Sequence, residues 1–359
     1  MSRPRLAPRT PLTELHVHLG AAVAPPIMWG IAHSQGIRLP TKDYWAFRDL
    51  ITAGRRRRSF QGYLDLFHWT ELIQSSPLAV ERSVYEVIGG AYRKSNITQI
   101  ELRFNPMKRN RGGEQDLDHI IAAAVRGMDR AVLEYPQVSA GLIFCLDRGF
   151  SRELNEIIAA KAIAWRSHGV VAVDIAGPVV ATFRFADYRD VFAACRRAGL
   201  GVTVHAGETG GPEEVREAIE ALEPTRIGHG VKSAYDAGVM ALLRERGIVL
   251  EVCPSSNLNT RVVADLSELR HILRRLVEHR VPFTLSTDGP EMLQSHLRDE
   301  INLLLRHGLL DLDEIEQAIQ TAHRASFLPP RDERGEPVQP PPRELELAAP
   351  ILTGFEVPG

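Results

Sequence analysis

The sequence has few cysteines, no long apolar run and almost no excess charge of either sign. Cys145, Cys195 and Cys253 are far apart and form no Cys-x-x-Cys pair. We therefore expect buried thiols in a reducing compartment, and neither a disulfide framework nor a thiolate zinc site. No apolar run is long enough to cross a bilayer, and no apolar signal segment follows the basic, proline-rich start. These absences predict a cytoplasmic protein.

Charge is nearly balanced, with 43 lysines and arginines against 45 aspartates and glutamates and a formal net charge of -2. This balance gives no electrostatic basis for binding nucleic acid or a membrane surface. The run Arg55–Arg58 is interpreted as a solvated loop. No Gly-x-Gly-x-x-Gly segment opens a helix, which argues against a dinucleotide-binding sheet. We expect a small-molecule partner, and the sequence does not indicate the oligomeric state.

Short apolar or β-branched runs alternate with amphipathic helical patterns along the chain. Such alternation predicts a parallel sheet covered by helices, and eight strands favour a closed (β/α)8 barrel over an open sheet. The expected strands are Thr13–Leu19, Ile97–Phe104, Val138–Leu146, Val170–Ala176, Gly201–His205, Thr225–His229, Ile248–Cys253 and Pro282–Thr287. The expected helices after the second strand are Asp116–Tyr135, Ser151–Ser167, Pro212–Leu222, Asp265–His279 and Asp299–His307. We assign residues 1–328 to one barrel domain and the proline-rich residues 329–359 to a surface or disordered tail.

A helical insertion of about residues 41–95 follows the first strand. Helical patterns run over Phe60–Ser76 and Leu78–Ser95. The insertion is rich in aromatic residues, among them Trp45, Phe47, Phe60, Tyr63, Phe67 and Trp69. They either belong to ordinary helix packing, which we favour for most of them, or form a lid over an apolar substrate at the C-terminal mouth of the barrel.

Two histidines one residue apart, His16 and His18, end the first expected strand. Side chains alternate along a strand, so both rings project from one face and can bind one divalent metal ion. On its own, this spacing also fits a half-buried strand with two satisfied histidines. Three later apolar runs, however, end in the same way, at His205, His229 and Asp288.

The carboxyl ends of the strands meet at one face of a (β/α)8 barrel, where active sites of this fold lie. A zinc ion there lowers the pKa of a bound water from about 15.7 toward 7 and supplies hydroxide. Glu208 can face the same cavity and carry a proton to a leaving group or ring nitrogen, and His229 is suited to orient the hydroxide. Four side chains are expected to hold one zinc ion per chain: His16, His18, His205 and Asp288.

With these segments in this order, the chain resembles the adenosine deaminase family of the amidohydrolase superfamily from about Leu12 to Leu328. The resemblance implies that the four ligands bind catalytic zinc and that Glu208 protonates the purine nitrogen beside the attacked carbon. It also implies that His229 assists the hydroxide, that the Gly177 backbone contacts the purine, and that Ala325–Leu328 belongs to the last helix. The matching segments are His16–Leu19, Glu101–Pro106, Asp174–Gly177, His205–Glu208, Arg226–Gly230, Glu251–Asn257, Ser286–Asp288 and Ala325–Leu328.

Two positions depart from that family's pattern, and both concern substrate recognition. Gly20 stands where an aspartate usually contacts the ribose 5′-hydroxyl, and Gly289 where a second aspartate holds a purine nitrogen. Pro178 and Val179 also follow Gly177 where an acidic residue is common. We count Gly20, Gly177 and Gly289 as the expected substrate-binding positions. The leading hypothesis is hydrolytic deamination of a purine nucleoside, either adenosine or a 5′-modified adenosine.

Three alternatives remain open from the sequence. Within deaminases, the substrate could be 6-aminodeoxyfutalosine, which is extended at its 5′ side and has no free hydroxyl there. A (β/α)8 metallohydrolase of esters or amides often uses two metals and a carboxylated lysine, but Asp174 stands at the end of the fourth strand. A non-catalytic metal-binding protein would be expected to lose Glu208 or His229 before the ligands, and both are present.

Overall fold

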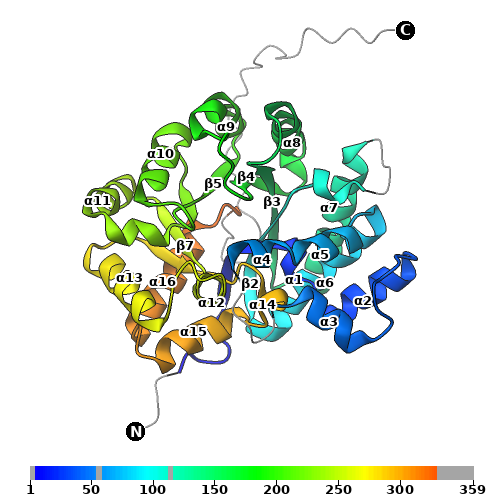
Figure 1. The fold of residues 1–359 in the computed structure, drawn as a ribbon, viewed down its shortest axis with the longest axis horizontal. Coiled ribbons are helices and arrows are strands. Elements are labelled where there is room, and N and C mark those ends of the chain that lie inside the picture. The colour runs from blue at the N-terminus through cyan, green and yellow to red at the C-terminus, as the bar shows by residue number, and fades with distance from the viewer. Residues whose placement is uncertain (1–4, 54–58, 112–115, 330–359) are drawn as a thin grey trace. The chain divides into compact units, whose positions relative to one another are not determined.

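A barrel of eight parallel strands, surrounded by helices, forms the centre of the computed structural model, which describes residues 5–53, 59–111 and 116–329 (Figure 1). Each strand pairs with the next one in the chain. The barrel closes where the His18 N–H donates to the Asp288 carbonyl at 2.8 Å and the Asp288 N–H donates to the His16 carbonyl at 2.8 Å. The strands are β1 Leu12–His18, β2 Ile97–Phe104, β3 Ser139–Asp147, β4 Val170–Ala176, β5 Gly201–Ala206, β6 Arg226–His229, β7 Val249–Val252 and β8 Phe283–Leu285. The predicted (β/α)8 fold is confirmed.

Helices follow the strands as the amphipathic patterns predicted. Several begin where a side chain accepts a hydrogen bond from a free backbone N–H of the first turn, as Ser151 does from Leu154 and Asp265 does from Glu268. The first helices are α1 Leu19–Ala22, α2 Pro25–Ser34, α3 Tyr44–Ile51, α4 Phe60–Leu64, α5 Phe67–Ile73, α6 Pro77–Ser95, α7 Leu117–Glu134 and α8 Arg152–Ala164. The later ones are α9 Arg189–Arg197, α10 Pro212–Leu222, α11 Ala237–Arg246, α12 Pro254–Asn259, α13 Leu266–Glu278, α14 Pro290–Leu293, α15 Leu297–Arg306 and α16 Leu312–Ala325.

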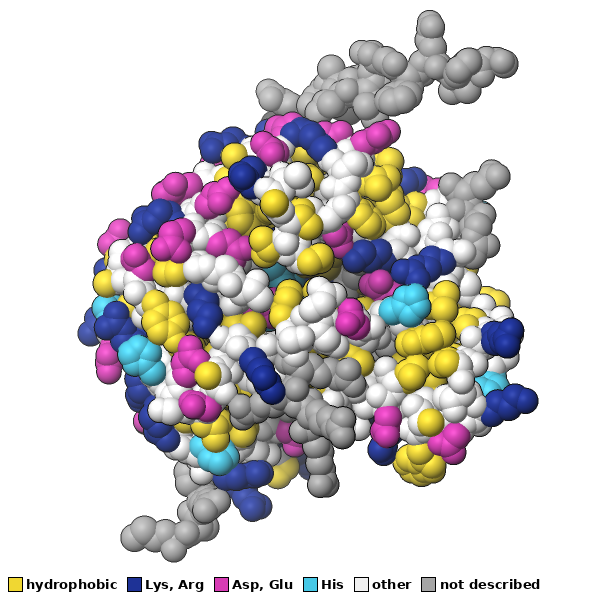
Figure 2. Space-filling model, viewed as in Figure 1, with side chains coloured by type: hydrophobic (Ala, Val, Ile, Leu, Met, Phe, Trp, Pro, Cys, Tyr) yellow, Lys and Arg dark blue, Asp and Glu magenta, His cyan; other side chains and the backbone are white. Residues whose placement is uncertain are grey.

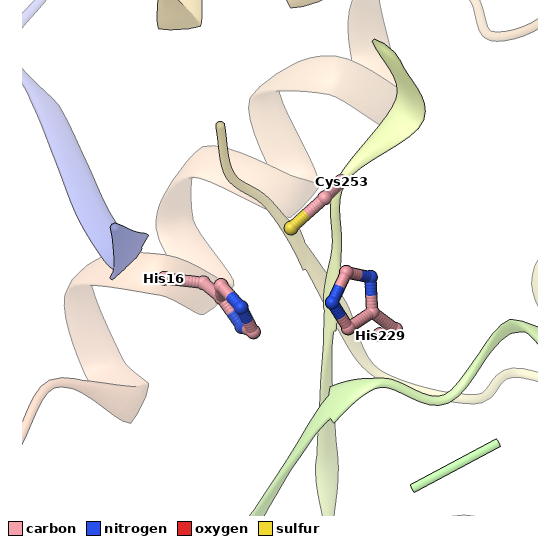
Figure 3. Close-up of side chains that lie close together, drawn as sticks. All are labelled: His16, His229 and Cys253. Carbon is pink, nitrogen blue, oxygen red and sulfur yellow. The ribbon is translucent and has the colours of Figure 1, made fainter. Parts of the chain in front are cut away.

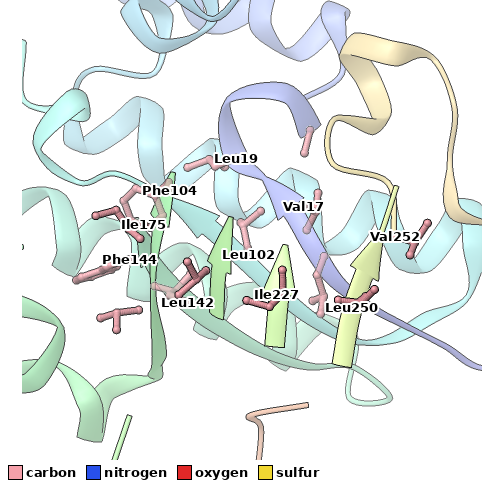
Figure 4. Packing of buried hydrophobic residues seen from close by; sticks show 14 of the residues in the cluster. Val17, Leu19, Leu102, Phe104, Leu142, Phe144, Ile175, Ile227, Leu250 and Val252 are labelled. Atoms are coloured by element: carbon pink, nitrogen blue, oxygen red, sulfur yellow. The ribbon is translucent and has the colours of Figure 1, made fainter. Parts of the chain in front are cut away.

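The strands separate an apolar layer from a polar barrel interior. Outward-facing side chains such as Leu102, Phe104 and Leu142 pack beneath the helices (Figure 4). The alternate residues on β2, Glu101 and Arg103, are buried with less than 1 % of their surface exposed. Alternation along each strand therefore gives the barrel a charged centre beneath the predicted active-site face.

The insertion after β1 divides into two parts with different roles. Helix α6 packs against α7 and β2, so it is the outer helix that connects the first two strands and no part of a lid. The pattern over Phe60–Ser76 forms two short helices, α4 and α5. In the view of Figure 1, α4 lies over the middle of the barrel beside α12 and α14.

The aromatic residues of the insertion divide in the same way. Phe47 is fully buried and Trp69 packs against the main core, as ordinary helix packing predicts. Trp45 is 62 % exposed. Only Phe60, Tyr63 and Phe67, on α4 and α5, line the cavity at the strand ends.

Several helices were not predicted, and the end of the chain corrects a further expectation. The unpredicted helices are α1, α2, α9, α11, α12, α14 and α16. Helix α16 ends at Ala325, so Ser326–Leu328 does not continue it; Ser326 is extended and donates its hydroxyl to Glu101 at 2.8 Å, beneath the barrel. Both Arg55–Arg58 and the tail beyond Pro329 lie outside the described residues.

The predicted buried thiols are confirmed, because all three cysteines are free and buried. None of the helices in the described part of the chain is both long and apolar enough to cross a membrane. On the face drawn in Figure 2, side chains of both charges are intermixed over the described residues. This distribution agrees with the balanced composition.

Candidate active site

The predicted metal ligands converge at the carboxyl ends of the strands. The ligand atoms of His16, His18 and His205 all lie within 4.8 Å of one another. His18 Nε2 is 3.3 Å from His205 Nε2 and 3.6 Å from Asp288 Oδ1. Zinc–nitrogen bonds of about 2.0–2.1 Å place tetrahedral ligands about 3.3–3.4 Å apart. The observed separations therefore fit a zinc ion.

Hydrogen bonds orient His16 so that one nitrogen is free for a metal. Its Nδ1 lies 2.7 Å from Glu251 Oε2, while its Nε2 is buried and has no hydrogen-bond partner among the described residues. Burial holds the pKa of His16 well below its usual range, so the ring is neutral. A neutral imidazole fixed through Nδ1 and buried at an unpaired Nε2 is the expected state of a ligand.

The other ligands are held in the same manner. Asp174 Oδ2 lies 2.9 Å from His205 Nδ1, which leaves Nε2 to face His18. Ser256 donates its hydroxyl to Asp288 Oδ2 at 2.6 Å, which leaves Oδ1 as the oxygen nearer to His18. Neighbouring carboxylates and a hydroxyl thus fix the direction of three of the four predicted ligands, His16, His205 and Asp288, before any metal binds.

Two site residues have backbone conformations that are rare for side chains other than glycine. His229 has φ 60° and Asp288 has φ 63°, both in the left-handed region. Such conformations cost about 1–3 kcal/mol each and persist where the surrounding structure imposes them, often at functional sites. His229 is the last residue of β6 and Asp288 lies three residues after the end of β8, so this backbone turn directs their side chains over the barrel.

Glu208 and His229 lie side by side next to the ligands. Glu208 Oε1 is 3.6 Å from His229 Nε2, and Asn257 contacts the other ring nitrogen, Nδ1, at 3.0 Å. Burial, followed by repulsion from Asp288, raises the pKa of Glu208 well above its usual range. Burial lowers the pKa of His229 to about 3, so this ring is neutral. The site therefore pairs a protonated carboxyl group with an uncharged imidazole.

Gly207 directs Glu208 into the cavity. Its φ is +65°, and a Cβ atom at this position would lie 2.4 Å from Val215 Cγ2. Only glycine avoids both the strained backbone and this contact. The turn after β5 thus depends on the glycine that separates His205 from Glu208.

Cys253 is a neighbour of the site that the sequence did not suggest. Its sulfur, a nitrogen of His16 and a nitrogen of His229 lie within 4.8 Å of one another (Figure 3). Burial raises the pKa of the Cys253 thiol well above its usual range, and the sulfur lies 3.5 Å from the Glu251 carbonyl. A neutral thiol is a poor zinc ligand, so the His16, His18 and His205 group is the better candidate.

The cavity above these residues is partly apolar. Its lining includes Phe60, Tyr63 and Phe67 from the insertion, together with Glu208 and Gly177. Aromatic rings and polar groups from the strand ends line the same cavity, so it suits a flat heterocycle with polar edges. Among the six aromatic residues considered for a lid, these three have the required position.

The two unusual glycines lie next to the cavity and do not line it. A Cβ atom at Gly20 would lie 2.9 Å from Phe67 Cδ1 and 3.1 Å from an Arg109 guanidinium nitrogen. A Cβ atom at Gly289 would lie 2.7 Å from the Tyr63 hydroxyl. The places beside Gly20 and Gly289 are thus occupied by side chains from other segments.

Several residues that organise the site were not assigned roles from the sequence. Asp174 and Glu251 hold two of the ligand histidines, while Ser256 and Asn257 contact Asp288 and His229. Each of these four residues belongs to a segment that resembles the family. Which site residue each one contacts, however, depends on which strands lie across the barrel from one another. The usable signal was a carboxylate on the inward-facing side of an otherwise apolar strand.

Known proteins resemble this chain over nearly its whole described length. The sequence model of the family described as adenosine deaminase matches residues 11–336. The chain is 31% identical to an adenosine deaminase from Clostridium kluyveri, over 90% of this chain and 91% of that one. Two solved structures are also similar. One is an adenine deaminase from Arthrobacter aurescens, with TM-score 0.79 and 21% identity over 89% of this chain and 94% of that one. The other is an amidohydrolase from Burkholderia ambifaria with bound Zn, with TM-score 0.75 and 22% identity over 91% of this chain and 87% of that one.

Proposed function

We propose that this chain, which belongs to the adenosine deaminase family and is an aminohydrolase, deaminates an aminopurine nucleoside with one bound zinc ion. The substrate is adenosine or a 5′-modified adenosine, and the products are the 6-oxo nucleoside and ammonia. One observation carries the proposal: four ligand atoms, a protonated carboxyl group and a neutral histidine meet in one partly apolar cavity.

The ligands proposed for zinc are His16, His18, His205 and Asp288. When bound, zinc supplies a water molecule of lowered pKa as the nucleophile. The solved relative with bound Zn supports this choice of metal. The unpaired Nε2 of His16 supports it independently.

The chain's own groups then handle the protons. Glu208, kept protonated by burial, donates to N1 of the purine, the ring nitrogen beside the carbon that carries the amino group. The uncharged His229 Nε2, 3.6 Å from Glu208, stabilises the oxygen that attacks that carbon. Asp288 accepts one proton of the attacking water and returns it to the leaving ammonia. The second proton of the water leaves the new oxygen as the 6-oxo group forms, and it restores the Glu208 carboxyl group. The backbone of Gly177, which lines the cavity, contacts the purine edge.

Ammonia release tests this function across adenine, adenosine, 5′-deoxyadenosine and 6-aminodeoxyfutalosine, with zinc measured in the same samples. We expect release from at least one nucleoside. Glu208→Gln should lower kcat by about 10²- to 10⁴-fold and retain zinc, because the amide cannot deliver a proton. Glu217→Gln is the control, since Glu217 is an exposed residue of α10 that does not line the cavity, and its kcat should equal that of the wild type. Near-normal turnover by Glu208→Gln would contradict the proposed proton donor.

A further inference from the structure

An ion pair at the edge of the cavity has no role in the proposed chemistry. Arg148 directly follows β3 and Glu214 lies in the first turn of α10, and both residues line the cavity. Arg148 Nη1 lies 3.2 Å from Glu214 Oε1, and 5% of the Arg148 side chain is exposed. Because a buried charge needs compensating partners, the remaining contacts of the pair indicate what it holds.

Both members of the pair bind the backbone of the turn that carries Glu208. Arg148 Nη2 donates to the His205 carbonyl. The second oxygen of Glu214, Oε2, accepts from the Gly207 N–H at 2.7 Å. The pair thus holds a carbonyl and an N–H that lie two residues apart, immediately before Glu208.

Neighbouring groups fix Arg148 itself. Its guanidinium carbon lies 5.5 Å from the centre of the Phe183 ring and 5.4 Å from that of the Phe185 ring, within the range of cation–π contacts. Its backbone N–H donates to the Ala176 carbonyl at the end of β4, at 2.9 Å. The pair therefore ties the turn after β5 to the segments that follow β3 and β4.

Gly210 gives the Glu214 side chain the room to reach this turn. A Cβ atom at Gly210 would lie 2.7 Å from Glu214 Cδ and 3.1 Å from Glu214 Cβ. The φ of Gly210 is not positive, so the backbone does not require glycine. The absence of a side chain at Gly210 therefore serves the close approach of the Glu214 carboxylate to the Gly207 N–H.

The charges of the pair have little combined effect on the protonation of Glu208. Burial, followed by repulsion from Asp288, raises the pKa of Glu208. Of the smaller influences, Arg148 lowers this pKa and Glu214 raises it. Because the two act in opposite directions, the contribution of the intact pair to Glu208 is one of position.

We propose that Glu214 is a positioning residue, which together with Arg148 fixes the turn after β5 and thereby aims Glu208 for proton transfer. The inference rests on the proposed function, in which Glu208 is the proton donor. Proton transfer needs the donor within about 2.6–3.2 Å of the acceptor, and a misplacement of about 1 Å can lower the rate by about 100-fold. Loosening the turn should therefore lower kcat and leave substrate binding nearly unchanged.

The test uses Glu214→Asp, which keeps the negative charge beside Arg148. Its side chain is one methylene shorter, so it cannot reach both Arg148 and the Gly207 N–H. We expect kcat to fall by about 10- to 100-fold, with KM and zinc content near the wild-type values. In the Glu208→Gln background, the same change should lower kcat by less than about 2-fold, because no proton donor is left to position. Glu217→Asp is the matched control, since Glu217 is exposed on the same helix, and its kcat should equal that of the wild type.

Hydrogen exchange of the Gly207 N–H, followed with zinc added in excess, separates this proposal from the proposed function. Exchange should be at least about 10-fold faster in Glu214→Asp than in the wild type, because a hydrogen bond to a carboxylate is lost. If no protein releases ammonia but exchange accelerates in this way, the deaminase function fails and the fixed turn stands.

Four results would overturn the proposal. Two of them are a kcat of Glu214→Asp equal to that of Glu217→Asp, and an exchange rate equal to that of the same control. A third is a loss of kcat in the Glu208→Gln background as large as in the wild type, since Glu214 would then act on another group. The fourth is a lower zinc content, which would mean that the pair acts through the predicted ligand His205.

Discussion

Replacing Glu251 with glutamine tests how the charged barrel centre supports the metal ligands. Glu251 Oε2 accepts hydrogen bonds from His16 Nδ1 at 2.7 Å and Arg103 at 2.8 Å. Its Oε1 accepts from Arg226 at 2.7 Å and Thr203 at 3.0 Å. In Glu251→Gln, an amide NH2 group replaces one of these two oxygens. Whichever oxygen is replaced, the NH2 group then faces the two hydrogen-bond donors that the oxygen had accepted from.

The expected effect has two parts. Arg103 and Arg226 are almost completely buried and lose a shared negative partner, and breaking a buried ion pair from one side costs about 3–5 kcal/mol. His16 also loses the carboxylate that orients it, and such a loss weakens metal binding by about 10- to 100-fold. This factor corresponds to about 1.4–2.7 kcal/mol of further destabilisation when zinc is present in excess. The zinc-loaded protein should therefore lose more stability than the metal-free protein.

Urea unfolding with and without saturating zinc measures both parts, and chelator competition gives the zinc affinity directly. Glu245→Gln serves as control, because Glu245 pairs with Arg244 at 3.5 Å and both side chains are largely exposed; we expect a change of less than about 0.5 kcal/mol. Equal losses of stability with and without zinc, or a loss in Glu251→Gln no larger than that of the control, would refute the reasoning.

Three further predictions concern metal, pH and substrate. The double variant His16→Ala with His18→Ala should purify with almost no zinc, whereas we expect one ion per chain in the wild type; metal analysis decides, and unchanged zinc content would exclude the site. Burial raises the pKa of Glu300 from its ordinary value of 4.5 to about 7. Between pH 4.5 and about pH 7, the folded state therefore holds a proton on Glu300 that the unfolded chain has released. The free energy of unfolding should therefore fall as pH rises through this window, and Glu300→Gln should remove that slope in urea unfolding; equal slopes for both proteins would contradict it. Finally, because Gly20 supplies no carboxylate to pair with a ribose 5′-hydroxyl, we expect 5′-deoxyadenosine to have a kcat/KM at least equal to that of adenosine. Gly20→Asp should shift the ratio of the two kcat/KM values toward adenosine, with Phe67 moving aside for the new side chain. A strong preference of the wild type for adenosine would argue against the prediction.

Much of the fold could be predicted because local patterns and long-range packing agree. The ends of the eight strands lie within two residues of the expected ends. Each apolar run must be buried beneath helices, and this holds regardless of which strands pair with it. Helix α11 was missed because its apolar and polar residues are poorly separated around the helix. The pattern over Phe60–Ser76 divided into α4 and α5, a break that the apolar spacing does not show.

The candidate ligands could also be predicted, because barrel geometry brings all strand ends to one face. The sequence identified His16, His18, His205 and Asp288 by that rule, and the structure places their ligand atoms together. It did not identify the partners that orient them, such as Glu251. Which residue faces which across a barrel depends on strand order and register, and neither is written in any local segment.

By itself, therefore, the sequence determined the barrel, the strand-end chemistry and the absence of two recognition carboxylates. Only the tertiary structure decided what occupies their places. Gly20 and Gly289 have no side chains of their own there, and these places are filled by Phe67 and Tyr63, which lie more than forty residues after Gly20 in the chain. The physical reason is that close packing leaves no void beside a missing side chain, and the residue that fills it is chosen by the fold of the insertion.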